Sequence, residues 1–259
     1  MAEMTKYNPG MFCWVDLATT DAGASKRFYL ELMGWTANDS PVGDGMVYTI
    51  LQKGGKNVCG LYGMDGEMIQ QGVPPHWQSY VCVESADRGA EKVGQSGGTV
   101  VMPPMDVMDL GRMAVVQDPT GAVFSLWEPR AYIGADIIYE PGALGWNELV
   151  TRDLPAASRF YTSMFGWSGN KMKGPSGEDY TEFKIGEQPV GGMLEIKQEW
   201  GEVPPNWAVY FCVEDCDATL QKAESLGASV VLPAMEVANV RFAFLKDRQD
   251  VYFGIAQIK

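Results

Sequence analysis

The sequence is poor in the residues that bind transition metals and nucleic acids. It has one histidine, His76, and its 259 residues include 20 Lys and Arg against 33 Asp and Glu, a formal net charge of −13. Nucleic acids and anionic membranes are bound by basic faces, so this balance argues against both as partners. The same charge favours a neutral or cationic small-molecule ligand.

Long apolar runs and paired cysteine motifs are also missing. No apolar run reaches the roughly 18 residues of a membrane-spanning helix, and the N-terminal MAEMTKYNPG lacks the apolar segment of a secretory signal. The five cysteines are odd in number and show no CxxC pairs at zinc-binding spacing. We therefore expect reduced thiols, a cytoplasmic location and no membrane association.

The chain instead contains a long internal repeat. PGMFCWVDLATTDAGASKRFYLELMGW at 9–35 returns as PGALGWNELVTRDLPAASRFYTSMFGW at 141–167, and VPPHWQSYVCVE at 73–84 returns as VPPNWAVYFCVE at 203–214. Matches in the same order along both halves indicate a gene duplication. The period is far too long for a solenoid, so the repeat predicts two homologous domains.

Each copy has the pattern of two α+β modules. In the first module, residues 22–33 carry apolar residues at helical spacing before Gly34, a helix stop. Alternating segments and turns predict the other elements. These are strands at 11–18, 46–51, 57–64 and 77–83, a helix at 86–98, and strands on either side of the turn at 118–121. Four such modules per chain predict curved mixed sheets with helices outside and an open concave face.

The helix pattern resembles that of the vicinal oxygen chelate superfamily. D-x-x-x-(S/A)-x-x-F-Y-x-x-x-x-G-W occurs in both copies, and DPTGAVFSLWEP at 118–129 resembles the family's last strand. This superfamily includes glyoxalase I, bleomycin-resistance proteins and extradiol dioxygenases. The tandem form is similar to two-domain glyoxalase-like proteins, which are often labelled hydroxylases or, in mycobacteria, a culture-filtrate antigen.

The resemblance covers almost the whole chain and implies a specific fold. We expect an α+β chain with glyoxalase-like domains at 8–130 and 141–258, a linker at 131–140, and two βαβββ modules in each domain. The resemblance does not imply one activity, because this scaffold hosts many chemistries.

Family members that use a divalent metal hold it at three positions of a domain, usually with His or Glu. The corresponding positions here are Trp14, Gln78 and Ser125 in the first domain, and Trp146, Ala208 and Gly254 in the second. None of them is His, Asp, Glu or Cys, and one amide oxygen does not hold a transition metal alone. We therefore expect no metal and no other cofactor.

The same concave faces carry aromatic and acidic residues. Alternation along a strand places Trp14 with Asp16 and Trp146 with Glu148. The further candidate ligand-binding residues are Gln78, Tyr80, Ser125, Trp127, Tyr210 and Tyr252, with His76 at the rim. Aromatic walls with few polar groups suit a flat or amphipathic small molecule. Asp16 and Glu148 are the candidates for pairing with a ligand cation or for general base catalysis.

Each of these assignments has a structural alternative. Trp14 and Trp146 could fill the core, and the two carboxylates could be held by a sheet neighbour or by Arg112 or Arg241. His76 could be a residue of a solvent-exposed loop instead of a rim acid or base.

The two cavities are also not equivalent in sequence. The polar residues of the first favour it as the functional one, whereas the smaller residues of the second would leave that cavity roomier.

Two functions therefore stay open, with a scaffold that has vestigial pockets as a third and weaker possibility. The first is binding of a small aromatic or cationic metabolite or drug without a metal, as in bleomycin-resistance members. The second is a glyoxalase-like lyase or isomerase, or a dioxygenase or hydroxylase, acting on a small oxo compound with Asp16 or Glu148 as the base. Paired domains would let the chain work as a monomer, and a homodimer is the alternative.

Overall fold

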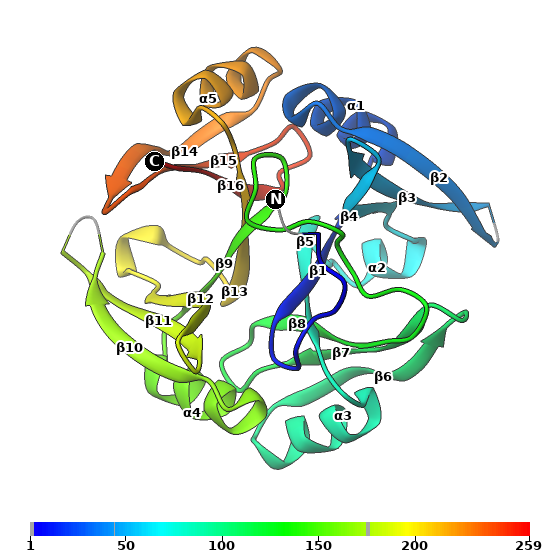
Figure 1. Ribbon diagram of the computed structural model, residues 1–259, viewed down its shortest axis with the longest axis vertical. Helices are drawn as coiled ribbons and strands as arrows, with labels where there is room; N and C mark the ends of the chain where they lie inside the picture. Colours follow the sequence, from blue (N-terminus) through cyan, green and yellow to red (C-terminus); the bar gives the residue numbers. More distant parts are fainter. Residues whose placement is uncertain (1–2, 44, 175–176) are drawn as a thin grey trace.

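The computed structural model describes residues 3–43, 45–174 and 177–259. It contains two eight-stranded mixed sheets, with the strand orders β2-β3-β4-β1-β5-β8-β7-β6 and β10-β11-β12-β9-β13-β16-β15-β14 (Figure 1). The second order repeats the first with every strand eight places later in the chain. The α+β fold with two tandem domains, each built on one curved sheet, is confirmed.

The first sheet and its helices comprise β1 (Phe12–Thr19), α1 (Ala22–Met33), β2 (Thr36–Gly43), β3 (Met46–Lys53), β4 (Lys56–Gly63), α2 (Gly66–Gln70), β5 (His76–Cys82), α3 (Ala86–Gln95), β6 (Thr99–Val107), β7 (Gly111–Gln117) and β8 (Val123–Pro129). The second comprises β9 (Leu144–Thr151), α4 (Leu154–Phe165), β10 (Ser168–Lys173), β11 (Asp179–Ile185), β12 (Gln188–Glu195), a 3-10 turn (Gln198–Trp200), β13 (Asn206–Cys212), α5 (Cys216–Ser225), β14 (Ser229–Val237), β15 (Val240–Lys246) and β16 (Tyr252–Ile258).

The repeated motif forms a capped helix in both domains. The Asp21 side chain accepts a hydrogen bond from the Ala24 amide (2.9 Å), and α1 ends at Gly34, whose φ is 68°. A left-handed C-cap of this kind favours glycine because it has no Cβ. Asp153 and Gly166 do the same for α4. The predicted helix at 22–33 is therefore confirmed.

Two strands of each domain lie at the sheet edges and lack a clear pattern. Every residue of β2 is exposed, and β6 is mostly exposed. An edge strand that buries neither face needs no apolar alternation. The sequence pattern therefore did not predict these strands, although the βαβββ module includes a further strand at this point.

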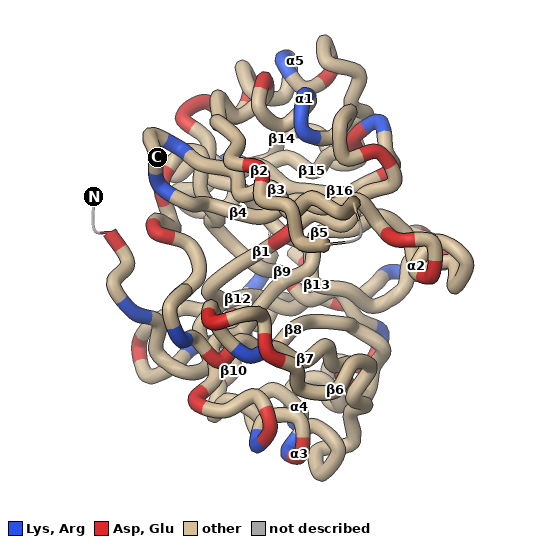
Figure 2. The backbone as a smooth tube through the Cα atoms, turned by 90° about the vertical axis from the view of Figure 1, so that its right-hand side faces the viewer, with Lys and Arg blue, Asp and Glu red and all other residues tan. Residues whose placement is uncertain are grey.

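The two domains pack against each other through the faces opposite their concave sides. Trp77 of β5 contacts Phe211 of β13, with ring centroids 4.9 Å apart, and the Ser79 hydroxyl donates to the Asn147 side chain at 2.7 Å. The helices surround this centre, with α1 beside α5 and α3 beside α4 (Figures 1 and 2). Each of these helix pairs joins one helix from each domain.

Repeated hydrogen bonds also cross the seam between the domains. The Tyr29 hydroxyl donates to Asp247 of the second domain (3.0 Å), and the Tyr161 hydroxyl donates to Asp118 of the first (2.9 Å). The tyrosine of each motif and the aspartate that precedes the last strand of the other domain therefore join the two domains to each other. No helix in the described ranges is long and apolar enough to cross a membrane.

Candidate functional site

A buried carboxylate stands at the middle of the first concave face. Asp16 lies on β1 between Gly60 of β4 and Gln78 of β5. Its Oδ2 accepts hydrogen bonds from the hydroxyls of Tyr80 (2.9 Å) and Tyr48 (3.1 Å). The Trp14 indole N–H in turn donates to the Tyr48 hydroxyl at 2.9 Å. We call Trp14, Asp16, Tyr48 and Tyr80 the first cluster.

The second domain repeats this arrangement with glutamate in place of aspartate. Tyr210 donates to Glu148 Oε1 (3.1 Å), and Tyr180 also hydrogen-bonds to that carboxylate. The Trp146 indole N–H donates to the Tyr180 hydroxyl at 2.9 Å. We call Trp146, Glu148, Tyr180 and Tyr210 the second cluster.

A glycine makes room for a tyrosine in each cluster. A Cβ built on Gly60 would lie 2.0 Å from the Tyr48 hydroxyl and 2.8 Å from the Asp16 Cβ. A Cβ on Gly192 would lie 1.7 Å from the Tyr180 hydroxyl. No side chain other than hydrogen fits at either position while the tyrosine stays in place.

Burial makes both carboxylates weaker acids than usual. Asp16 is 2 % exposed, and its Oδ1 has no hydrogen-bond partner among the residues that the structure describes. Burial raises its pKa to about 7, although Tyr80 and Tyr48 lower it. Burial also raises the pKa of Glu148 to about 7, against the lowering effect of Tyr180 and Tyr210. Each group can therefore gain or lose a proton near neutral pH, which suits an acid or a base.

The interpretation in which an arginine holds these carboxylates is wrong. Arg112 pairs with Asp87 of α3 and with Asp106, at 2.8 Å each, and Arg241 pairs with Asp217 of α5 at 2.7 Å. Both arginines therefore reach towards the helix-bearing side. Tyrosine hydroxyls, which carry no charge, take their place at the carboxylates.

The other predicted residues of the first domain are brought together only in part. Gln78 donates to the Ser125 hydroxyl (3.0 Å) beside the first cluster, and Trp127 packs edge-on against Tyr80 with centroids 6.5 Å apart.

His76 lies apart from the cluster. Its Nδ1 is 2.8 Å from the Pro74 carbonyl, and its counterpart Asn206 makes the same contact with Pro204, so the position shapes a turn in both domains.

The two clusters differ in their access to solvent. Trp14 is 5 % exposed, and Tyr132 of the predicted linker packs edge-on against it with centroids 5.4 Å apart. The Trp127 indole donates to the Tyr132 carbonyl (3.0 Å), which fixes the linker over the first cluster.

In the second domain Trp146, Glu148 and Tyr180 are partly exposed. Three side chains of the first face are replaced there by smaller ones, whereas Phe242 and Phe244 replace the smaller Met113 and Val115. Ala208, Gly254 and Ala256 stand where the first domain has Gln78, Ser125 and Trp127. Tyr252 lies at the outer end of this face and is 51 % exposed. Trp146 and Glu148 are therefore more exposed than Trp14 and Asp16.

The residues at the family's ligand positions do not fit a divalent metal. In the first domain they are an indole, an amide and a hydroxyl, and the last two are bonded to each other. In the second they are an indole and two positions, Ala208 and Gly254, with no donor atom in the side chain. Over the described ranges no group of three or more His, Cys, Asp or Glu gathers in a metal-binding arrangement. A site of three or four convergent ligands is therefore not provided by these positions.

Sequence reasoning missed Tyr48, Tyr180 and the two glycines. The offset of the repeat contains the signal, since Tyr48 and Gly60 each recur 132 residues later as Tyr180 and Gly192. These residues lie outside the motif that defines the family resemblance, so only a residue-by-residue comparison of the two halves would have found them.

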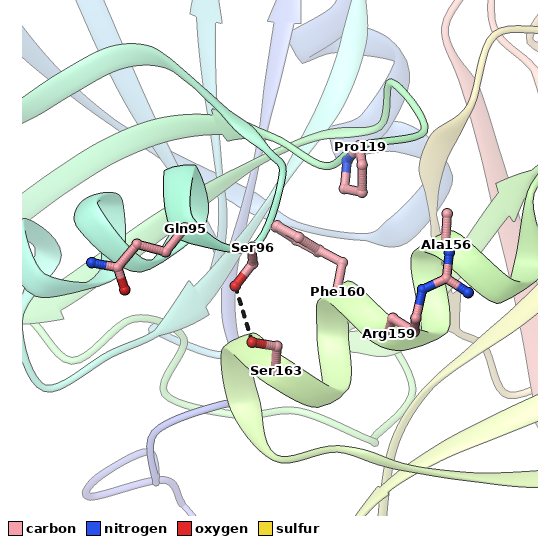
Figure 3. A pocket seen from close by; sticks show the side chains of 7 residues that line it. All are labelled: Gln95, Ser96, Pro119, Ala156, Arg159, Phe160 and Ser163. Atoms are coloured by element: carbon pink, nitrogen blue, oxygen red, sulfur yellow. Dashed lines mark hydrogen bonds between the residues drawn. The ribbon is translucent and has the colours of Figure 1, made fainter.

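A separate surface depression lies at the seam between the domains. It has a volume of about 340 Å³ and is lined by Gln95, Ser96, Pro119, Ala156, Arg159, Phe160 and Ser163 (Figure 3). Ser96 of the first domain and Ser163 of α4 are joined across it by a 3.0 Å hydrogen bond. Its wall holds no carboxylate and lies on the helix side, away from both clusters.

Comparisons with known proteins agree with this architecture. The chain is 39% identical over 257 residues to a Mycobacterium tuberculosis protein named "Putative glyoxylase CFP32", covering 98% of this chain and 97% of the relative. It is 37% identical over 270 residues to "Anthracycline biosynthesis protein DnrV" of Streptomyces peucetius, covering 99% and 96%.

Among solved structures, the Mn(II)-bound glyoxalase from Novosphingobium aromaticivorans matches with a TM-score of 0.67 at 14% identity, covering 96% of this chain and 82% of that one. The 2,3-dioxygenase LapB from Pseudomonas sp. KL28 matches with a TM-score of 0.65 at 12% identity, covering 96% and 93%. At these identities the likeness shows the fold alone. The family model for the Glyoxalase/Bleomycin resistance protein/Dioxygenase superfamily matches residues 12–126 and 143–253, and the chain therefore belongs to this superfamily.

Proposed function

We propose that the protein binds a small aromatic or cationic metabolite or drug on a concave face, without the divalent metal of other family members. The observation that carries this proposal is the repeated cluster of a carboxylate, two tyrosines and a tryptophan. In each domain the tryptophan occupies a position where metal-using relatives place a ligand. Aromatic rings around one polar group suit the recognition of a flat ligand.

The relatives support the same class of ligand. DnrV is named for anthracycline biosynthesis, and anthracyclines contain fused aromatic rings. The net charge of −13 also disfavours anionic ligands and favours cationic ones.

An enzyme is the second candidate, and the pKa of about 7 at both carboxylates favours it. A carboxylate with this pKa can remove a proton from a carbon next to a carbonyl group and return it elsewhere, as a lyase or isomerase must. The dioxygenase or hydroxylase alternative rests on membership of a superfamily whose description includes dioxygenases.

Binding can be tested with three flat probes in buffer containing EDTA. Proflavine is cationic, 2-naphthol is neutral and 2-naphthoate is anionic. We expect proflavine or 2-naphthol to raise the melting temperature, because a ligand at 100 times its Kd stabilises the fold by about 2.7 kcal/mol. If no probe changes the melting temperature or the tryptophan fluorescence, the binding proposal is wrong. Turnover of methylglyoxal with common thiols, lost in Asp16→Asn or Glu148→Gln, would favour the enzyme instead.

A further inference from the structure

Several aromatic rings share the face of the second sheet that holds Glu148. Tyr210 packs against Phe244 and Phe242, with ring centroids 5.5 and 6.3 Å apart. The register of the sheet places Phe244 and Tyr210 on either side of Gly254, whose missing side chain leaves space for the Tyr210 ring. We call Trp146, Tyr180, Tyr210, Phe242 and Phe244 the second-domain cage.

The charges near this cage are suited to a cation. The neighbouring charge that shifts the pKa of Glu148 is that of Glu178, which is also negative. At the rim, the positive charge of Lys246 is offset by an ion pair with Asp250 (2.6 Å), and its ammonium lies 6.0 Å from the centroid of the Tyr252 ring. Ring faces attract ammonium groups through their quadrupole, and the carboxylate adds an opposite charge when it is ionised.

Access separates this cage from the first cluster. Trp146 and Glu148 reach solvent in part, whereas their counterparts Trp14 and Asp16 are 5 % and 2 % exposed. Ala208 lies beside Glu148 in the register, where the first domain has Gln78 beside Asp16. Glu148 is therefore the less buried of the two carboxylates, whereas Asp16 is 2 % exposed and its neighbour Trp14 is packed against Tyr132.

On this basis we infer that the second-domain cage is the binding site for an organic ammonium group, held by Glu148 and the surrounding ring faces. The inference rests on the proposed function and deepens it, because it names the domain that binds and the part of the ligand that is recognised. It also reverses the expectation from sequence that the more polar first face is the functional one.

The test compares three probes that share one ring and differ in charge. These are benzyltrimethylammonium, benzyl alcohol and benzoate, titrated by calorimetry into the full chain and into matched variants. Glu148→Gln removes the carboxylate of the second cluster, and Asp16→Asn removes the carboxylate of the first. Ala208→Gln inserts the residue of the first domain beside Glu148 and leaves the carboxylate present. Circular dichroism confirms that each variant folds before it is titrated.

The cation should bind the wild type at least tenfold more tightly than the other two probes do. Glu148→Gln and Ala208→Gln should each weaken it at least tenfold, while Asp16→Asn changes its affinity less than twofold. Loss of cation binding in Asp16→Asn alone would overturn the inference. Equal binding of the three probes would also overturn the inference, but it would not contradict the proposed function. Absence of binding by all three probes, together with failure of the flat probes above, would overturn both.

Discussion

Asp16→Asn should increase the free energy of unfolding at pH 8 by several kcal/mol relative to the wild type, and change it little at pH 4. Asp16 is buried, one of its oxygens has no hydrogen-bond partner within the described part of the chain, and burial raises its pKa from 3.8 to about 7. Ionisation of Asp16 therefore requires more free energy in the folded state than in the unfolded chain. Asparagine has the shape of the protonated acid but never ionises.

The sign of this effect follows from proton linkage. Between pH 4 and pH 7 the folded protein keeps the proton of Asp16 while the unfolded chain loses it, so stability falls as the pH rises and levels off above the folded pKa. At roughly 1.4 kcal/mol per tenfold change in proton affinity, the loss is about 4 kcal/mol at most. The ionisable neighbours Tyr48, Tyr62, Tyr80 and Cys59 all have raised pKa values and stay neutral over this range.

Urea unfolding at pH 4, 6 and 8 measures the effect. Asp87→Asn is the control, and its effect should have the opposite dependence on pH. Arg112 lowers the pKa of the exposed Asp87 carboxylate, so the stability that this ion pair adds is lost as the pH falls. Equal pH dependence in the wild type and Asp16→Asn would mean that Asp16 is ionised at little cost. The burial argument would then fail.

Gly60→Ala should destabilise the fold by about 3 kcal/mol, because overpacking costs about 1–3 kcal/mol and the displaced Tyr48 also loses hydrogen bonds. The new methyl would lie 2.6 Å from the Tyr48 ring carbon that carries the hydroxyl, so the ring must move. That movement breaks its hydrogen bonds to Asp16 and Trp14. Thermal and urea unfolding give the size of the loss.

Gly63→Ala on the same strand is the matched control. Its Cβ would meet only the Ala22 Cβ, at 3.8 Å, an ordinary contact. It should change stability by less than about 1 kcal/mol, the usual range for a substitution that creates neither a clash nor a cavity. Equal effects of the two substitutions would show that the close approach of Tyr48 is not what requires glycine at position 60.

The domain architecture could be predicted from sequence because the duplication leaves strong local signals. Asp21 and Gly34 define the ends of α1, and the same pair, Asp153 and Gly166, defines α4. Edge strands such as β2 gave no signal, since none of their residues is buried.

The candidate site could be predicted only in part. Strand alternation correctly placed Asp16 with Tyr80 and Glu148 with Tyr210, because residues of paired strands that share a face meet across the sheet. Tyr48 reaches the carboxylate from a strand that is not adjacent to β1 in the sheet, over the flat surface of Gly60. Local periodicity carries no information about that contact.

The relative openness of the two faces also depends on contacts that a motif does not contain. Tyr132 covers the first cluster only because the linker is fixed along the sheet. The Ala135 amide donates to the Cys13 carbonyl, and the Tyr7 hydroxyl donates to the Ala135 carbonyl, both at 2.8 Å.

The central claim is that the carboxylate clusters work without the divalent metal of other family members, and the metal content of the untagged protein tests it most directly. The protein is incubated with zinc, nickel, manganese and iron(II), desalted and analysed by mass spectrometry, beside Asp16→Asn and Glu148→Gln. We expect far less than one metal ion per chain in all three proteins. Near-stoichiometric metal in the wild type that disappears in either variant would contradict the account and return the site to metal-dependent chemistry.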